Sequence, residues 1–132
     1  MKNAGNLQAR KVSSIFVAAL AGAAALAACS SRDPSFSRDV APILAMNCTE
    51  CHAPGKEGFV ASGFDTTSYA SILKGGKFGA LVKPGDAFTS ALNMLVEGRA
   101  NPKIRMPHGR QKLADADIET LKNWVNQGAK NN

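Results

Sequence analysis

The sequence predicts a small all-α domain, and the clearest evidence lies near its carboxyl end. Ile118, Leu121, Trp124 and Val125 recur at the spacing i, i+3, i+6 and i+7, which places one apolar stripe on a helix that Gly128 would end. A second segment, residues 38–47, carries Val40, Ile43 and Leu44 on one face. No segment shows the alternation of apolar and polar residues that is typical of a strand. We therefore expect two terminal helices that pack together through these faces, with Trp124 and Ile118 in the core.

Capping and turn residues divide the rest of the chain. Ser37 is expected to cap the first helix, in which Pro42 is tolerated because it lies near the start. Glycine and proline predict loops over residues 53–67 and 100–111 and a turn over residues 83–86. Between them, residues 68–74 and 88–97 predict two further helices, ended by Gly75 and Gly98. Asp115 and Asp117 suit the amino-terminal turn of the last helix.

The amino terminus predicts export. Residues 1–11 contain three basic and no acidic residues, and the apolar run over residues 12–27 is short for a membrane span. An uncleaved anchoring helix is the alternative. Leu26-Ala27-Ala28-Cys29 resembles the lipobox of bacterial lipoproteins, in which the cysteine becomes the acylated first residue; the alternative is an ordinary cleavage site that precedes a cysteine. We expect a signal peptide over residues 1–28, a lipidated tether over residues 29–36, and one domain over residues 37–132.

Processing changes what the charge implies. The full chain has a formal charge of +6, but the signal carries three of the basic residues, so the remaining 104 residues carry 13 basic and 10 acidic side chains. This balance does not favour nucleic-acid binding; it allows a mildly basic face for acidic partners. The length fits one domain with a modest core.

Residues 48–52 read Cys48-Thr49-Glu50-Cys51-His52, the C-x-x-C-H spacing of covalent haem attachment. Each thiol can add across a haem vinyl group, forming a carbon–sulfur bond while its hydrogen goes to the other vinyl carbon. His52 then lies where it can ligate the iron from one face. The alternatives are half of a zinc site, which needs four ligands, and a dithiol redox pair, which is expected beside a βαβ unit.

The two signals support each other, because covalent haem attachment in bacteria belongs to the periplasmic side. One lipid on Cys29 and two thioethers at Cys48 and Cys51 also account for all three cysteines. We expect a lipid anchor on that side of a bacterial membrane, and Ser30 favours the outer membrane.

The chain from Phe36 to Ala129 resembles the class I (mitochondrial-type) cytochrome c domains, and more narrowly the single-haem domains of planctomycetes. The matching stretches are residues 39–44, the haem motif, residues 82–86, Arg105-Met106-Pro107-His108-Gly109, and residues 113–129. The resemblance implies that the terminal helices pack around one covalent haem c. Two positions depart from the family pattern: His108 stands where a second proline is common, and Ala114 where a Ser or Thr helix cap is common.

The resemblance assigns the iron two axial ligands, His52 and Met106. A thioether opposite an imidazole suits a closed electron-transfer site, because both axial positions are filled and the reduction potential is raised. His108 is the alternative to Met106, and Pro107 restricts the loop so that we expect only one of the two side chains to point inward. Met94 is a weaker candidate, and Met46 lies too close to the motif to reach the opposite face.

Supporting roles are less specific. Candidates to line the haem pocket are Pro84, Phe64, Tyr69, Leu73 and Leu92; Tyr69, Arg105 and Lys83 are candidates to bond the haem propionates, although such side chains are more often solvated.

The function expected from these features is that of a membrane-tethered, single-haem electron carrier that meets redox proteins transiently and is not an enzyme. The first alternative is a haem enzyme or a gas or redox sensor with an open sixth iron position. The second is a structural or binding lipoprotein that the haem merely holds together.

Overall fold

The computed structural model describes residues 32–132, so the predicted signal peptide and Cys29 lie outside the described residues. Its helices are η1 (Phe36–Val40), α1 (Ala41–Asn47), α2 (Glu57–Ser62), α3 (Tyr69–Lys74), α4 (Ala91–Glu97), η2 (Pro102–Ile104) and α5 (Asp115–Asn126). The described part forms no strand, only an isolated bridge between Gly76 and Gly79, which agrees with the all-α prediction. Over the same residues, no helix has the length and apolar character needed to cross a bilayer.

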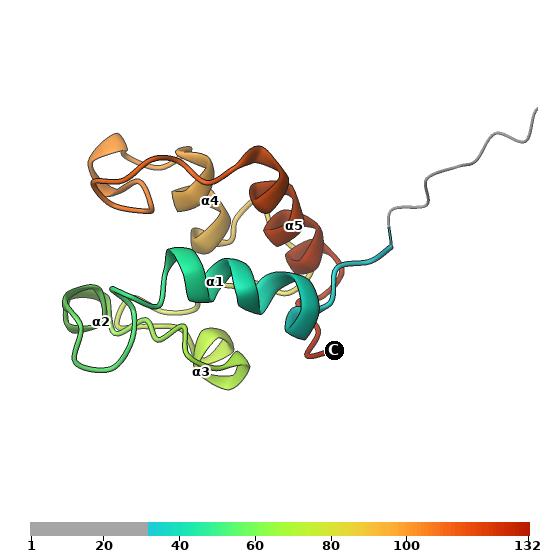
Figure 1. The fold of residues 1–132 in the computed structure, drawn as a ribbon, viewed down its shortest axis with the longest axis horizontal. Coiled ribbons are helices and arrows are strands. Elements are labelled where there is room, and N and C mark those ends of the chain that lie inside the picture. The colour runs from blue at the N-terminus through green and yellow to red at the C-terminus, as the bar shows by residue number, and fades with distance from the viewer. Residues whose placement is uncertain (1–31) are drawn as a thin grey trace, which may run out of the picture. The chain divides into compact units, whose positions relative to one another are not determined.

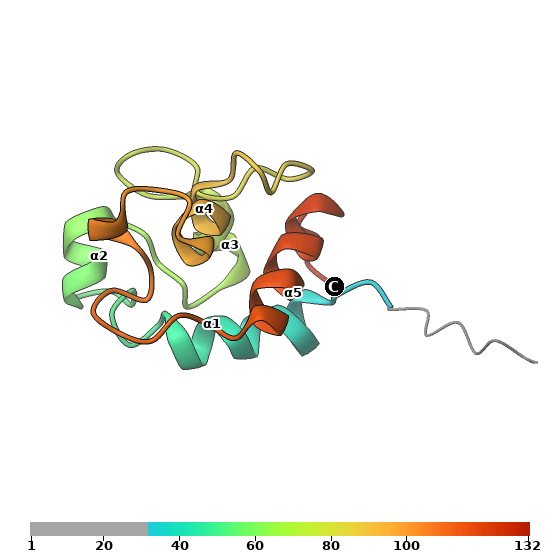
Figure 2. The same cartoon turned by 90° about the horizontal axis from the view of Figure 1, so that it is seen from above.

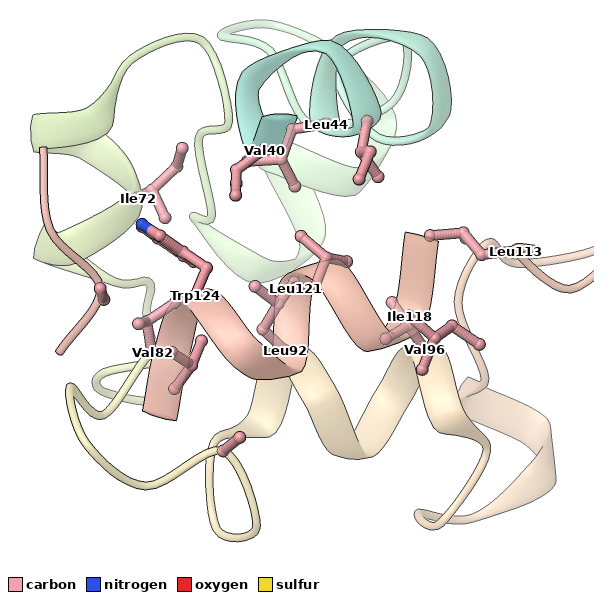
Figure 3. Close-up of a cluster of buried hydrophobic side chains, with 14 of the residues drawn as sticks. Val40, Leu44, Ile72, Val82, Leu92, Val96, Leu113, Ile118, Leu121 and Trp124 are labelled. Atoms are coloured by element: carbon pink, nitrogen blue, oxygen red, sulfur yellow. The ribbon is translucent and has the colours of Figure 1, made fainter. Parts of the chain in front are cut away.

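The helices surround one apolar core. In Figure 1, helices α4 and α5 lie on one side of α1, whereas helices α2 and α3 lie on its other side. The predicted stripe of α5 is the set of residues that the helix buries: Ile118, Leu121, Trp124 and Val125. In Figure 3, Val40 and Leu44 of the first helical segment point toward Leu121. The predicted contact between the two terminal helical segments is therefore present.

The first helical segment begins earlier than predicted, as a π-helical turn over Phe36–Val40 that leads into α1. Its cap is Ser35, whose hydroxyl accepts a hydrogen bond from the Arg38 amide, so the prediction that Ser37 is the cap was wrong. The Ser37 hydroxyl instead donates to the carbonyl of Asn132. Pro42 lies in the first turn of α1, where its missing amide hydrogen leaves no helix bond broken.

The middle of the chain confirms some predicted ends and corrects others. Helix α3 has the expected span, with Ser68 and Ser71 in a reciprocal capping box. Helix α4 ends at Gly98 as predicted, but it starts only after Ser90, three residues later than expected. Helix α2 was not predicted, because its segment was expected to be a loop; it is short and ends at Gly63, whose φ of +70° suits glycine.

The two ends of the described chain lie together. The backbone carbonyl of Asn132 accepts bonds from the Ser37 amide at 2.9 Å and the Ser35 hydroxyl at 2.7 Å, while its side chain accepts from the Phe36 amide at 2.8 Å. The Phe36 ring packs against Trp124 of α5, with centroids 5.7 Å apart. These contacts fix the start of the helix that leads into residues 48–52.

Candidate haem site

The C-x-x-C-H motif forms a helical turn directly after α1. The Cys48 amide bonds the Leu44 carbonyl at 2.9 Å, and the His52 amide bonds the Cys48 carbonyl at 2.9 Å. Helical spacing places residues i, i+3 and i+4 on one side, which brings Cys48, Cys51 and His52 together. All three line the same cavity, so the predicted attachment and ligand residues converge in space.

This cavity has a volume of about 450 Å³, within the range of small-molecule sites. Helix α4 contributes Leu92, Leu95 and Val96, while Phe64, Leu81 and Leu113 come from the segments between helices. Met106, Pro107, His108 and Arg110 contribute from the loop before α5. The lining is therefore mostly apolar, with the two thiols and the imidazole as its chemically distinctive groups.

His52 is held in its place by close packing. Its Nδ1 atom is buried without a hydrogen-bond partner, and its ring lies edge-on to Phe64 with centroids 5.8 Å apart. Burial lowers the pKa of His52 below its usual value, and the neighbouring Phe64 backbone opposes this in part. The ring is therefore neutral at neutral pH and has a lone pair available for a metal ion.

Gly58 of α2 gives this ring its space. A Cβ at Gly58 would lie 2.9 Å from Cε1 of His52, 3.1 Å from its Nδ1 and 2.8 Å from the Cys51 carbonyl oxygen. The Phe59 amide bonds that same carbonyl at 3.0 Å, so α2 is docked against the motif. The sequence interpretation treated Gly58 only as a loop residue and missed this role.

Thr66 fixes the motif from another direction. Its amide bonds the His52 carbonyl at 2.9 Å, and its hydroxyl lies 3.0 Å from the hydroxyl of Thr49, inside the motif. Thr66 is buried, so these hydrogen bonds face little competition from water. Nothing in the local sequence distinguished this threonine from its exposed neighbour Thr67.

Cys48 does not have the lowered pKa that is typical of a reactive dithiol. Burial, with a smaller contribution from Cys51, raises the pKa of the Cys48 thiol to about 11. Reactive dithiols instead have lowered pKa values. Within the described residues, no three His, Cys, Asp or Glu side chains gather as a metal-binding group. Both thiols are free, as addition to a vinyl group requires.

Of the candidates for the sixth iron ligand, Met106 fits best. It is partly buried, packs against the core, and is anchored by a bond from its amide to the Leu95 carbonyl at 3.1 Å. His108 also lines the cavity but is an exposed residue. Met46 is 80% exposed on α1, and Met94 is not among the lining residues.

Several supporting candidates lie elsewhere. Phe64 and Leu92 line the cavity as expected, whereas Pro84, Tyr69 and Leu73 do not. The Tyr69 hydroxyl donates to the Ala129 carbonyl at 2.8 Å, the Lys83 ammonium to Thr89, and Arg105 to the Arg110 carbonyl at 2.8 Å.

The cationic side chain at the cavity is Arg110, which the sequence interpretation missed. It is paired with Glu50 of the haem motif at 2.9 Å. Hydrogen bonding and charge from Glu50 raise the pKa of Arg110. Both side chains are exposed, so the pair adds little to stability.

The donor set and the cavity fit a covalently attached haem. Two free thiols and a neutral imidazole face one apolar space, and the imidazole has a buried nitrogen with no protein partner. An all-helical domain with this turn and this cavity has the features that a c-type cytochrome domain needs.

Comparison with protein families supports the same class. Residues 48–109, from the first cysteine of the motif to the end of the Met106 loop, match the family of planctomycete cytochrome c. This match confirms the resemblance drawn from the sequence. Comparison with curated proteins and with solved structures gave no match.

Proposed function

We propose that this protein is a membrane-tethered, single-haem electron carrier of the bacterial cell envelope. The observation that carries the proposal is the convergence of Cys48, Cys51, His52 and Met106 on one apolar cavity. A haem c bound there would supply a one-electron Fe(III)/Fe(II) couple.

Each group of cavity residues would have its own role in holding the haem. Cys48 and Cys51 would hold the ring covalently, and His52 and Met106 would ligate the iron. Leu92, Leu95 and Val96 of α4 line the cavity and would keep water away from the bound ring. With the iron ligated by two side chains, no substrate bond would have to form or break, and the protein would act by binding and orienting the haem alone.

The proposed location follows from the amino terminus. A lipid on Cys29 would hold the domain at a membrane on the periplasmic side, the outer membrane being favoured by Ser30. The anchored domain would then encounter redox proteins at the same membrane by diffusing in two dimensions. Such partners dock transiently, through interfaces of less than about 1,200 Å².

The first test is the absorption spectrum of the purified haem-loaded protein, oxidised and reduced. We expect a low-spin spectrum with the weak long-wavelength ferric band of methionine ligation. Met106→Ala should abolish that band, and the matched control His108→Ala should leave it unchanged. A high-spin wild-type spectrum, with ready binding of carbon monoxide, would contradict the proposal and favour an enzyme or a sensor with an open sixth position.

A further inference from the structure

The segment between α3 and α4, residues 75–90, carries two exposed phenylalanines; we call it the connector. Phe78 is 88% exposed and Phe88 is 75% exposed. The other described phenylalanines, Phe36, Phe59 and Phe64, are buried or partly buried. Exposing a large aromatic ring to water is unfavourable, and two such rings ten residues apart make this segment a candidate contact surface.

Hydrogen bonds hold both rings outward. Phe78 lies in a tight turn closed by two backbone bonds between Gly76 and Gly79, at 3.0 and 3.1 Å. The carbonyl of Phe88 accepts a bond from Arg99 at 3.0 Å, and the guanidinium carbon of Arg99 lies 4.9 Å from the centre of the Phe88 ring. Both turns are thus fixed by the fold.

The same region is basic. Lys74, at the end of α3, and Lys77 and Lys83, in the connector, are all exposed. The acidic residue of the connector is Asp86, whose bonds to the amide and hydroxyl of Thr89 lower the pKa of its carboxyl and keep it ionised. Three exposed lysines therefore stand against one carboxylate. The connector therefore offers aromatic rings beside lysines, the combination that binds the interface of a membrane with anionic lipids.

We propose that the connector rests on an anionic lipid surface, with Phe78 and Phe88 in the interfacial layer and the lysines at the headgroups. The proposal rests on the lipid anchor of the proposed function. Cys29 and Ser35 are six residues apart, and a fully extended chain of that length spans only about 20 Å. A domain tethered so closely must present some face to the bilayer.

A lipid surface suits this segment better than a protein partner does. The two rings project from separate turns, and a fluid headgroup layer can receive separate side chains without a matching surface. A protein interface instead needs close shape complementarity. Each lysine held at an anionic surface strengthens binding by about fivefold.

The contact would also orient the domain. In Figure 2 the connector runs along the edge of the fold opposite α1, and this edge is the one that would meet the bilayer. Leu81 of the connector lines the cavity, so the haem site would lie close to the contact face.

Hydrogen exchange of the full processed, haem-loaded protein tests this orientation. It would be compared in detergent, in phosphatidylcholine vesicles, and in vesicles of roughly 3:1 phosphatidylcholine and phosphatidylglycerol. We expect amides of the connector to exchange at least about tenfold more slowly in the anionic vesicles only. The double variant Phe78→Ser/Phe88→Ser should lose this protection. Met46→Ser/Val60→Ser, which removes exposed apolar side chains from α1 and α2, should keep it.

Other outcomes would overturn the proposal. If the connector amides were protected equally in both kinds of vesicle, the lysines would not be binding anionic headgroups. If the amides of α1 or α2 were protected instead, another face of the domain would rest on the bilayer. Protection that appears without vesicles at higher protein concentration would indicate a second copy of the chain. Protection only in native membranes would indicate a protein partner. Mass spectrometry of the amino-terminal peptide tests separately whether Cys29 carries a lipid. If it carries none, co-sedimentation of the protein with anionic vesicles still tests whether the connector binds them.

Discussion

At the scale of single residues, the site depends on groups that pack around His52 as much as on the motif itself. The spacing of Cys48, Cys51 and His52 is a local property, so the sequence alone predicted that these side chains converge. Gly58 and Thr66 act on the motif from other segments, and their contacts exist only in the folded chain. Such contacts have no sequence spacing that could predict them.

Gly58→Ala should disturb the axial histidine. Alanine normally stabilises a helix relative to glycine by about 1 kcal/mol. Here its Cβ would meet the Cys51 carbonyl oxygen at 2.8 Å and the His52 ring at 2.9 Å, and overpacking of this kind costs about 1–3 kcal/mol. We therefore expect a less stable haem-loaded protein, with a shifted reduction potential and altered NMR signals of the ligated imidazole.

Val60→Ile is the matched control for Gly58→Ala, because it adds one methyl group to the same helix at a side chain that is 60% exposed. It should change neither the potential nor the imidazole signals. A Gly58→Ala protein that is more stable than the wild type, with unchanged signals, would mean that the ring does not need this space.

At the scale of helices, the long apolar pattern of α5 predicted its helix correctly, the short helix α3 was predicted from its capping residues, and the short helix α2 was missed. The stripe of α5 extends over two turns, and the structure buries the same four side chains that the sequence indicated. Helix α2 contains a glycine and has only six residues, so tertiary docking on the Cys51 carbonyl outweighs its weak intrinsic preference. For α4, Ser90 supplies the start, and residues 88–89 belong to the turn that exposes Phe88.

Some residues that line the cavity were predicted from the sequence, and others were not. Met106 was predicted through the family resemblance, and its loop does reach the cavity of the motif. Leu95 and Arg110 could not be assigned, because whether such residues face a cavity or solvent depends on how α4 and the loop before α5 are rotated. The structure also separates Met106 from His108 by burial, which the sequence could not do.

Leu121→Ala tests the contact between α5 and the first helical segment. Leu121 is fully buried, and its truncation should lower the free energy of unfolding by about 2–5 kcal/mol through lost apolar burial and a residual cavity. Urea unfolding of the haem-loaded protein measures this loss. Lys122→Ala, on the neighbouring position of α5, should change stability by less than about 0.5 kcal/mol. An equal effect of both variants would mean that the helix contact contributes little.

At the scale of the whole described domain, residues 130–132 close the fold beside residues 35–37 and the first helical segment. The Trp124 indole donates to the Lys130 carbonyl at 2.9 Å, and three groups of residues 35–37 donate to the carbonyl of Asn132. Trp124 and Ser35 are both buried, so loss of these acceptors would leave buried donors without partners. The last three residues therefore hold the start of the helix that leads into the haem motif.

Deletion of residues 130–132 should accordingly destabilise the domain by about 2 kcal/mol or more, because each buried unpaired donor costs about 1–3 kcal/mol. The expected result is a lower urea midpoint with an unchanged slope, since the surface exposed on unfolding is nearly the same. Lys130→Ala is the matched control: it removes an exposed side chain and keeps the backbone carbonyl that Trp124 uses. If the deletion and the control have the same midpoint as the wild type, the tie between the chain ends contributes nothing, and the contact of Phe36 with Trp124 alone holds the first turn in place.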